Sequence, residues 1–171
     1  MRSSRQAGAA AKKVQTQSTN APAGGDAASA PRRLADFFVV LIVDDNEINR
    51  RVSACSLMLD GVDLVFAANG VEALDRYREF LPDVVLMDVA MPEMDGYGAT
   101  AAIRAFERAE RLAPSHIVAL TAHAMPGDRE KCLAAGMDEY ISKPVSPEDL
   151  RRFVERLQAE TTPPDRRRPA D

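Results

Sequence analysis

The chain has 171 residues, of which 46% are hydrophobic, and this suffices for a single domain with its own core. The net charge of −4 combines basic ends with an acidic middle at 36–160, which argues against direct nucleic-acid binding by the folded part. There is no signal-peptide pattern and no apolar run near the ~18 residues of a membrane span, and we expect Cys55 and Cys132 to be buried free thiols in a cytoplasmic protein.

The two ends of the chain are predicted to be disordered. Residues 1–35 are rich in Ala, Ser, Thr, Gln, Gly and Pro and have almost no large apolar side chains, and residues 161–171 read TTPPDRRRPAD. Such segments cannot bury enough surface to offset the conformational entropy lost on folding. We therefore expect one domain at 36–160 between a leader or linker and a short tail.

The folded part begins with the apolar run VVLIV at 39–43, and four more short apolar runs follow along the chain. Segments with helical spacing separate these runs, and the first contains Ile48, Val52, Cys55 and Leu59. The other expected strands are DLVFA (63–67), VVLM (84–87), HIVAL (116–120) and EYI (139–141), and the later helical segments contain Leu74, Tyr77 and Leu81, then Ala99, Ile103 and Phe106, then Leu150, Phe153, Val154 and Leu157.

Local signals agree with these helices. Asn69 and Glu72 have the spacing of a capping box, Ser146 places a capping hydroxyl before a proline, and Gly136 ends the fourth helix. Continuous apolar strands alternating with helices predict an α/β fold, a (βα)5 doubly wound five-stranded parallel sheet covered by helices on both faces. In such sheets, ligands bind beyond the carboxyl ends of the strands, where the strand order reverses.

Five polar residues stand at those strand ends. Asp44 and Asp45 follow the first expected strand, and Asp88, Thr121 and Lys143 follow the third, fourth and fifth. Each alone has an ordinary explanation, such as a helix cap or a solvated ammonium, but five on one edge indicate a site. Three carboxylates suit Mg²⁺, which would also offset the repulsion between adjacent aspartates, and an aspartate carboxylate can be a nucleophile toward phosphorus.

With these features the sequence resembles the receiver domain of two-component response regulators, and most closely the receivers attached to hybrid sensor histidine kinases. The resemblance covers essentially all of residues 39–157, and it implies the flavodoxin-like strand order 2-1-3-4-5. The matching stretches are VDDNEINRRV, FAANGVEAL, DVVLMDVAMPEMDGYGAT, IVALTAHAMPGDREKCLAAGMDEYISKPV and the final helix.

The resemblance implies a phosphorylation site that uses Mg²⁺ as its cofactor. Asp88 would be the phosphoacceptor. Asp45 would bind the metal directly, Asp44 would act at least partly through water, and the backbone carbonyl of Ala90 would complete the protein's share of the coordination. Lys143 would pair with the phosphoryl oxygens.

The resemblance also implies how the phosphate is read and how long it lasts. Thr121 would swing its hydroxyl onto the phosphoryl group while Tyr140, the aromatic switch residue, turns inward and changes the face of the fourth helix, fifth strand and fifth helix. Pro144 would follow a cis peptide bond. Ala90 is smaller than the Met or Gln common at its position, so we expect Ala90 and His123 to affect the phosphate lifetime.

The function implied by the resemblance is that of a phosphorelay receiver, a signalling domain that catalyses only its own phosphorylation and dephosphorylation. Its partner would be a sensor histidine kinase or a histidine phosphotransfer protein, and it would be a monomer or a weak phosphorylation-dependent dimer. Both a stand-alone regulator and the C-terminal receiver of a hybrid histidine kinase remain open as origins.

Two other functions are less consistent with the sequence. A Mg²⁺-dependent phosphohydrolase resembling haloacid dehalogenases would place two aspartates two residues apart on the first strand, whereas Asp44 and Asp45 are adjacent. A receiver-like module that is not phosphorylated would lack at least one of the five strand-end residues, and none is missing.

Overall fold

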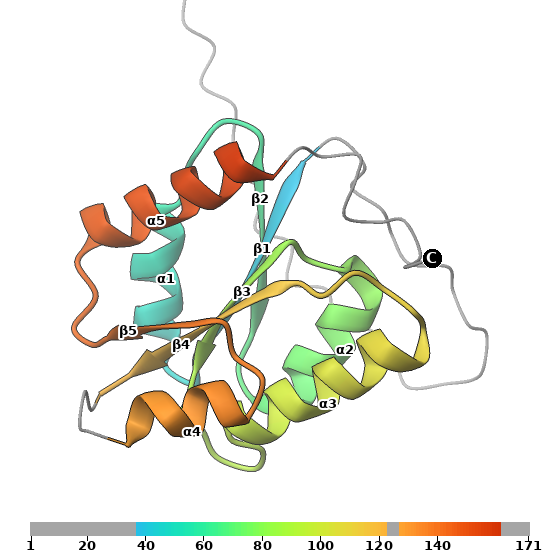
Figure 1. The fold of residues 1–171 in the computed structure, drawn as a ribbon. Coiled ribbons are helices and arrows are strands. Elements are labelled where there is room, and N and C mark those ends of the chain that lie inside the picture. The colour runs from blue at the N-terminus through green and yellow to red at the C-terminus, as the bar shows by residue number, and fades with distance from the viewer. Residues whose placement is uncertain (1–36, 123–126, 162–171) are drawn as a thin grey trace, which may run out of the picture.

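The computed structural model describes residues 37–122 and 127–161, in which five strands alternate with five helices (Figure 1). The predicted leader, nearly all of the predicted tail and His123 lie outside the described residues. The elements are β1 (Phe38–Val43), α1 (Glu47–Ser56), β2 (Val62–Ala67), α2 (Gly70–Phe80), β3 (Val84–Asp88), α3 (Gly96–Ala109), β4 (His116–Thr121), α4 (Asp128–Ala134), β5 (Glu139–Ser142) and α5 (Pro147–Glu160).

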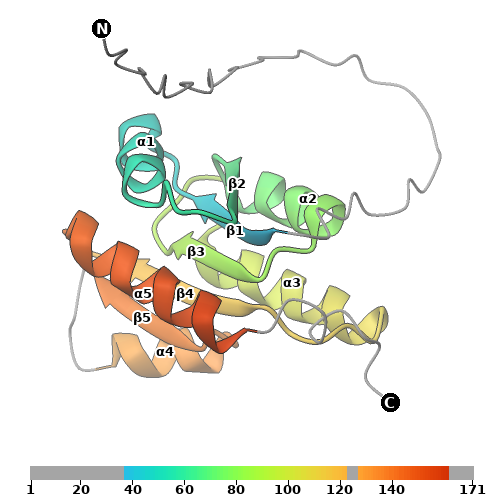
Figure 2. The ribbon, with the colours of Figure 1, turned by 90° about the horizontal axis from the view of Figure 1, so that it is seen from above.

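The strands form one parallel sheet in the order β2-β1-β3-β4-β5, which confirms the predicted doubly wound fold. Helices α1 and α5 cover one face of the sheet, and α2, α3 and α4 cover the other (Figures 1 and 2). The strand order reverses between β1 and β3, which are neighbours at the centre and pair Val43 with Met87. Residues that follow these two strands therefore emerge side by side at the carboxyl edge of the sheet.

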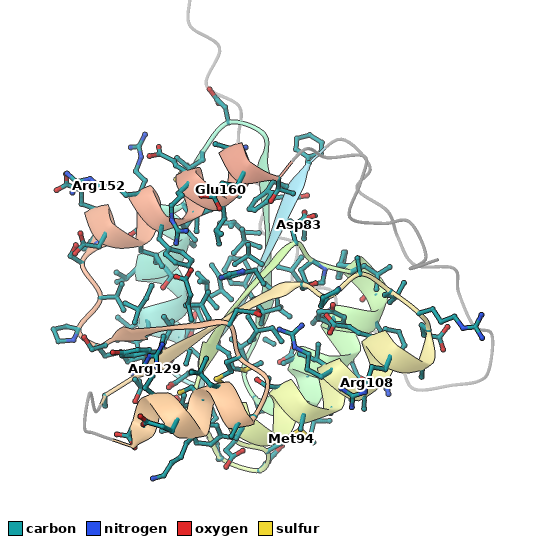
Figure 3. The ribbon with its side chains drawn as sticks, viewed as in Figure 1. Asp83, Met94, Arg108, Arg129, Arg152 and Glu160 are labelled. Atoms are coloured by element: carbon teal, nitrogen blue, oxygen red, sulfur yellow. The ribbon has the colours of Figure 1, made fainter. Side chains whose placement is uncertain are left out.

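Strand β1 lies at the centre of the core, and all of its residues, Phe38–Val43, are buried. Successive side chains of a strand point to opposite faces, so its odd-numbered residues pack under α2, α3 and α4 and its even-numbered residues under α1 and α5. At the amino edge of the sheet, Asp83 accepts a hydrogen bond from the Val39 backbone N–H at 2.8 Å. Asp83 and Met94, which flank β3 in the sequence, lie at opposite ends of the strands (Figure 3).

The three capping signals expected from the sequence are found at the ends of α2, α4 and α5. The Asn69 side chain accepts a hydrogen bond from the Glu72 N–H at 2.8 Å, and the Glu72 carboxylate accepts one from Ala68, one residue before the cap. The Ser146 hydroxyl caps α5. After α4, Gly136 adopts the left-handed φ of +96° that a helix-ending glycine provides.

Helix α1 differs from the prediction in the face that it buries. The sequence places Ile48, Val52 and Cys55 at helical spacing, and we expected Cys55 to be buried, but Cys55 is exposed and Ile48 and Val52 are 69% and 49% exposed. The sheet side of α1 carries smaller residues, Ser53 and Ala54 among them, so the core under this helix comes mainly from α5. Helical spacing defines a stripe of side chains, but it does not say which stripe faces the core.

Candidate functional site

The five strand-end residues found in the sequence all lie at the carboxyl edge of the sheet. Asp44 and Asp45 directly follow β1, Asp88 and Thr121 are the last residues of β3 and β4, and Lys143 directly follows β5. The register pairs Asp88 with Leu120, which places Thr121 one step further along the neighbouring strand. The edge position is the one at which doubly wound sheets bind their ligands.

The three aspartates form a compact acidic cluster. One carboxylate oxygen from each of Asp44, Asp45 and Asp88 lies within 4.8 Å of the others. Asp44 and Asp88 are buried and Asp45 is exposed. Like charges at such distances repel strongly beside a low-dielectric core, so the cluster needs compensating positive charge.

Lys143 supplies part of that compensation. Its Nζ lies 2.9 Å from an oxygen of Asp44 and 2.9 Å from an oxygen of Asp88, so one ammonium bridges the two buried carboxylates. Burial by itself lowers the pKa of Lys143, but the hydrogen bonds and charges of Asp44 and Asp88 outweigh burial and raise the pKa above its ordinary value. The bridge leaves the cluster with an excess of negative charge.

Asp44 is held by donors from the start of α1 that the sequence reasoning did not identify. Its carboxylate accepts hydrogen bonds from the Asn46 N–H at 2.9 Å and from the Asn49 side-chain amide at 3.1 and 3.2 Å. The Arg50 guanidinium donates to the Asp44 backbone carbonyl at 2.6 Å. The available signal was the position of Asn49 and Arg50 in the first turns of the helix that follows the acidic pair.

The remaining candidate residues lie around this cluster. The backbone N–H of Ala90 donates to the Asp88 carboxylate at 3.2 Å. Thr121 is buried, and its backbone carbonyl accepts a hydrogen bond from the Lys143 N–H at 2.7 Å. Tyr140 is 41% exposed on β5, and the peptide bond between Lys143 and Pro144 is cis.

The donor set fits a small, hard divalent cation. Three carboxylates provide oxygen ligands. Lys143 forms an ion pair with Asp44, whereas the exposed carboxylate of Asp45 is not part of that pair and is available to a metal ion. Mg²⁺ binds through one or two carboxylates and keeps several of its waters, so it does not need a closed cage of protein ligands. The excess negative charge of the cluster matches a divalent ion.

The fold and this cluster define a class: a doubly wound α/β domain with a lysine-bridged acidic site at the point where the strand order reverses. The chain belongs to the response regulator receiver domain family, whose model matches residues 40–155. Receiver domains are signalling modules of two-component systems, and they bind Mg²⁺ at an acidic site.

Relatives of this chain include both multidomain kinases and single-domain regulators. It is 42% identical over 120 residues to hybrid signal transduction histidine kinase I of Dictyostelium discoideum and 43% identical over 115 residues to the sensor protein GacS of Pseudomonas syringae pv. syringae. These alignments cover 67% of this chain but 7% and 13% of those proteins. The polar-differentiation response regulator DivK of Brucella anthropi is 36% identical, over 70% of this chain and 93% of that protein.

Solved structures show the same fold. The receiver domain of the Pseudomonas aeruginosa sensor histidine kinase PA1611, which has a magnesium ion coordinated in its active-site cleft, is 38% identical, with a TM-score of 0.62 over 72% of this chain and 98% of that one. The Vibrio cholerae chemotaxis protein CheY4 is 30% identical, with a TM-score of 0.64 over 71% of this chain and 98% of that one. Among the described residues of this chain, no helix is long and apolar enough to cross a membrane.

Proposed function

We propose that this domain is a phosphorelay receiver that takes a phosphoryl group from a phosphohistidine onto Asp88 and passes it to water or to a downstream phosphotransfer protein. The observation that carries the proposal is the constellation around Asp88. Its carboxylate is buried at the carboxyl edge, lies within 4.8 Å of two further aspartates and contacts the Lys143 ammonium at 2.9 Å.

In the proposed transfer, a carboxylate oxygen of Asp88 forms a bond to phosphorus while the bond between phosphorus and the histidine nitrogen breaks. The electron pair of that bond leaves with the imidazole, and the product is an aspartyl phosphate. Lys143 already lies beside Asp88, so its ammonium can follow the new phosphoryl oxygens and stabilise their charge.

The metal would be held by the acidic cluster. Asp45 and Asp88 would be direct ligands together with the Ala90 carbonyl, and Asp44 would act at least partly through water because Asn46, Asn49 and Lys143 already occupy its carboxylate. When bound, Mg²⁺ would neutralise charge on the transferred phosphoryl group.

The partner would dock on the exposed stripe of α1. Ile48, Val52 and Cys55 form this stripe, and together with Pro147 they line a shallow apolar pocket beside Arg51. The stripe begins three residues after Asp45, so it is continuous with the phosphorylation site. A protein that presents a phosphohistidine on an amphipathic helix could cover the stripe while its imidazole reaches Asp88.

The signal would leave through Thr121 and Tyr140. Thr121 is buried on β4 next to the acceptor strand, and Tyr140 lies on β5 with 41% of its surface exposed. If the Thr121 hydroxyl moves onto the phosphoryl group, space opens for the Tyr140 ring to turn inward. The face formed by α4, β5 and α5 would then change, and the phosphorylated state would be recognised by that change.

The relatives favour two settings for this receiver. The matches to hybrid histidine kinases support a receiver that forms one part of such a kinase, and the match to DivK supports a stand-alone regulator. For either setting we propose a location in the cytoplasm. In either setting the domain itself would catalyse only its own phosphorylation and dephosphorylation.

The direct test of the proposed acceptor is Asp88→Asn. We expect the variant to remain folded and to lose labelling by acetyl phosphate or by a phosphohistidine protein in Mg²⁺. Asp60→Asn is the matched control, since Asp60 is an exposed aspartate that precedes β2 at the opposite edge of the sheet. Labelling of Asp88→Asn at the wild-type level would remove Asp88 from the mechanism.

A further inference from the structure

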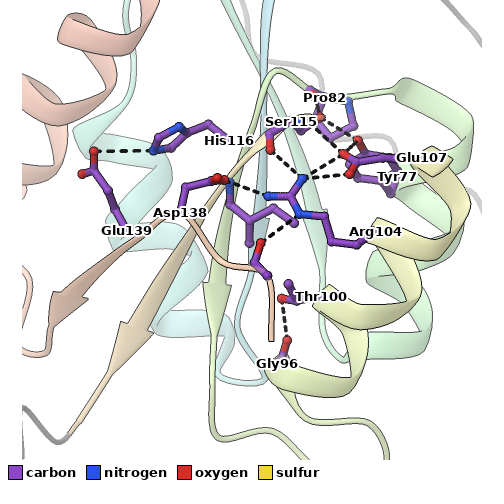
Figure 4. Close-up of polar contacts among 12 residues, drawn as sticks. Tyr77, Pro82, Gly96, Thr100, Arg104, Glu107, Ser115, His116, Asp138 and Glu139 are labelled. Atoms are coloured by element: carbon purple, nitrogen blue, oxygen red, sulfur yellow. Dashed lines mark hydrogen bonds and ion pairs between the residues drawn. The ribbon is translucent and has the colours of Figure 1, made fainter. Parts of the chain in front are cut away.

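At the amino edge of the sheet, far from the acidic cluster, Arg104 of α3 joins three parts of the fold (Figure 4). Its side chain is only 12% exposed. The guanidinium donates to the Gly136 carbonyl at 2.8 Å, to Glu107 at 2.8 Å, to the Ser115 carbonyl at 2.9 Å and to Asp138 at 2.8 Å. One planar group thus connects α3, the residue before β4 and the segment between α4 and β5.

Glu107 ties this arginine to the interior. Its carboxylate is buried and also accepts hydrogen bonds from the Tyr77 hydroxyl at 2.5 Å and from the Ser115 N–H at 2.8 Å. The Ser115 hydroxyl in turn donates to the Pro82 carbonyl. Because buried charges are costly unless they are paired and hydrogen-bonded, Arg104 is held in one position from the α2 and α3 side.

The segment between α4 and β5 is fixed just as closely. Asp138 accepts hydrogen bonds from both Arg104 and the Ile117 N–H of β4, the latter at 2.7 Å. Gly136 lies against the arginine so tightly that a Cβ on it would stand 3.1 Å from the Arg104 Cγ. Cys132 and Met137 are buried in the core on either side of this glycine. The C-terminal end of α4 is therefore attached to α3, to β4 and to the hydrophobic core.

Among the described residues, the first turn of α4 forms no hydrogen bond or ion pair with another element, and its Asp128–Lys131 ion pair, at 3.5 Å, lies within the helix. Its capping residue is Gly127, which has no side chain to cap the helix, and within the described part of the chain no heavy atom lies within 4 Å of the place that a Cβ would occupy there. An uncapped first turn is the easiest part of a helix to displace. This end lies on the side of the phosphorylation site, because α4 runs back across the sheet from the carboxyl edge to the amino edge.

We infer that α4 is a lever fixed at its C-terminal end, with Arg104 holding the pivot at Gly136–Asp138. The inference rests on the proposed function, since it concerns how the response to phosphorylation spreads. A change at Thr121 and Tyr140 would displace the first turn of α4 and leave the pivot in place. Recognition of the phosphorylated state would then depend on residues at the N-terminal end of α4, beside β5, rather than on its C-terminal end.

The test is nuclear magnetic resonance of the full chain with Mg²⁺, before and after addition of beryllofluoride as a phosphate mimic. In the wild type we expect signals of Thr121, Tyr140 and residues 128–130 to shift. The amides of 136–138 and the Nε–H of Arg104 should shift no more than the amides of β1, which serve as an internal reference.

Asp138→Ala releases the pivot without unpairing Glu107, and the exposed position of Asp138 allows water to replace it. In this variant we expect the beryllofluoride shifts to spread into 136–137 and to exceed the β1 reference. Arg104→Lys, which cannot reach all four acceptors, should do the same, and Arg108→Lys, an exposed arginine one turn further along α3, should behave as wild type.

The outcomes separate the two claims. Beryllofluoride shifts at 136–138 of the wild type that match those of Tyr140, or a response of Asp138→Ala identical to that of the wild type, would contradict the pivot alone. The absence of any response at Thr121 and Tyr140 would contradict the proposed function and the pivot with it. If Arg104→Lys does not fold, the wild type and Asp138→Ala still decide between these results.

Discussion

Lys143 is the residue that makes three neighbouring carboxylates tolerable when no metal is bound. Its ammonium lies between Asp44 and Asp88, whereas Asp45 is exposed and relies on water to screen its charge. A divalent cation would relieve the remaining repulsion, so metal binding and folding stability should be linked at this site.

For Asp45, we predict opposite effects of a neutral substitution with and without Mg²⁺. Mg²⁺ should raise the melting temperature of the wild type by mass action. Asp45→Asn should melt at a higher temperature than the wild type without metal, because one repelling charge is gone, and should gain little from Mg²⁺. Thermal melts of both proteins across a Mg²⁺ titration provide the measurement. An unchanged Mg²⁺ response would place Asp45 outside the metal site.

For Ala90, we predict that a larger side chain prolongs the life of the aspartyl phosphate. Hydrolysis needs a water in line with the breaking bond, and under the proposed function the methyl group of Ala90 would shield little of that approach. Ala90→Met should therefore slow dephosphorylation, and a tenfold effect corresponds to only ~1.4 kcal/mol in the barrier. Single-turnover loss of phosphate from both proteins in Mg²⁺ decides the point, and equal or faster loss from the Met variant would contradict it.

The buried hydroxyl of Tyr77 should make the folded protein lose stability at alkaline pH. Burial and the hydrogen bond to Glu107 raise the pKa of its hydroxyl above the ordinary value of 10.0. Above that pH the unfolded chain loses the proton before the folded protein does, so the folded state binds more protons and its stability falls as the pH rises.

We predict that Tyr77→Phe is less stable than the wild type at neutral pH but loses less stability above pH 10. The buried tyrosine can contribute a slope of up to ~1.4 kcal/mol per pH unit, and phenylalanine removes that contribution. Lys143, whose pKa is also raised, contributes equally to both proteins. Urea unfolding at several pH values between 9 and 11.5 measures the two slopes, and parallel slopes would contradict the assignment.

Among the elements, α1 has an exposed apolar stripe that indicates a binding surface. Its apolar residues have helical spacing, yet the helix turns them to solvent and leaves the core to α5. An exposed apolar stripe beside an acidic site is costly for solubility unless a partner covers it at times.

We predict that Val52→Asp slows phosphoryl transfer from a phosphohistidine protein and leaves phosphorylation by acetyl phosphate unchanged, because only the protein donor needs the docking stripe. Val71→Asp is the matched control, since Val71 is a similarly exposed valine on α2. Transfer rates from both donors to the three proteins provide the measurement. If Val52→Asp slows both donors equally, the stripe is part of the phosphorylation site's structure and not a docking surface.

The elements were largely predictable because their signals are local. Strand runs, caps and the helix-ending Gly136 each depend on a few neighbouring residues, and all were found where the sequence placed them. The face that α1 buries was not predictable, since it depends on how much core α5 supplies. The contacts of Asn49 and Arg50 with Asp44 were also missed, because polar residues at the start of a helix usually face solvent and nothing in their spacing says otherwise.

At the scale of the whole molecule, the doubly wound topology explains why one edge carries the chemistry and the opposite edge carries the buried Arg104–Glu107 pair. The reversal of strand order brings the ends of β1 and β3 together, as the resemblance to receiver domains implied, whereas the arginine network at the amino edge joins residues far apart in the sequence and had no local signal. At the amino edge, the hydrogen bonds of Arg104 join α3 to the residue before β4 and to the segment between α4 and β5.

The central claim is that Asp88 accepts the phosphoryl group, and the most direct measurement is to locate that group in the wild-type protein. The protein is phosphorylated in Mg²⁺, the acyl phosphate is reduced with borohydride, and the peptides are mapped by mass spectrometry. The account predicts one modified residue, Asp88, converted to homoserine. Modification at Asp44 or Asp45 instead, or a phosphoryl group on a histidine or serine that borohydride does not reduce, would contradict it.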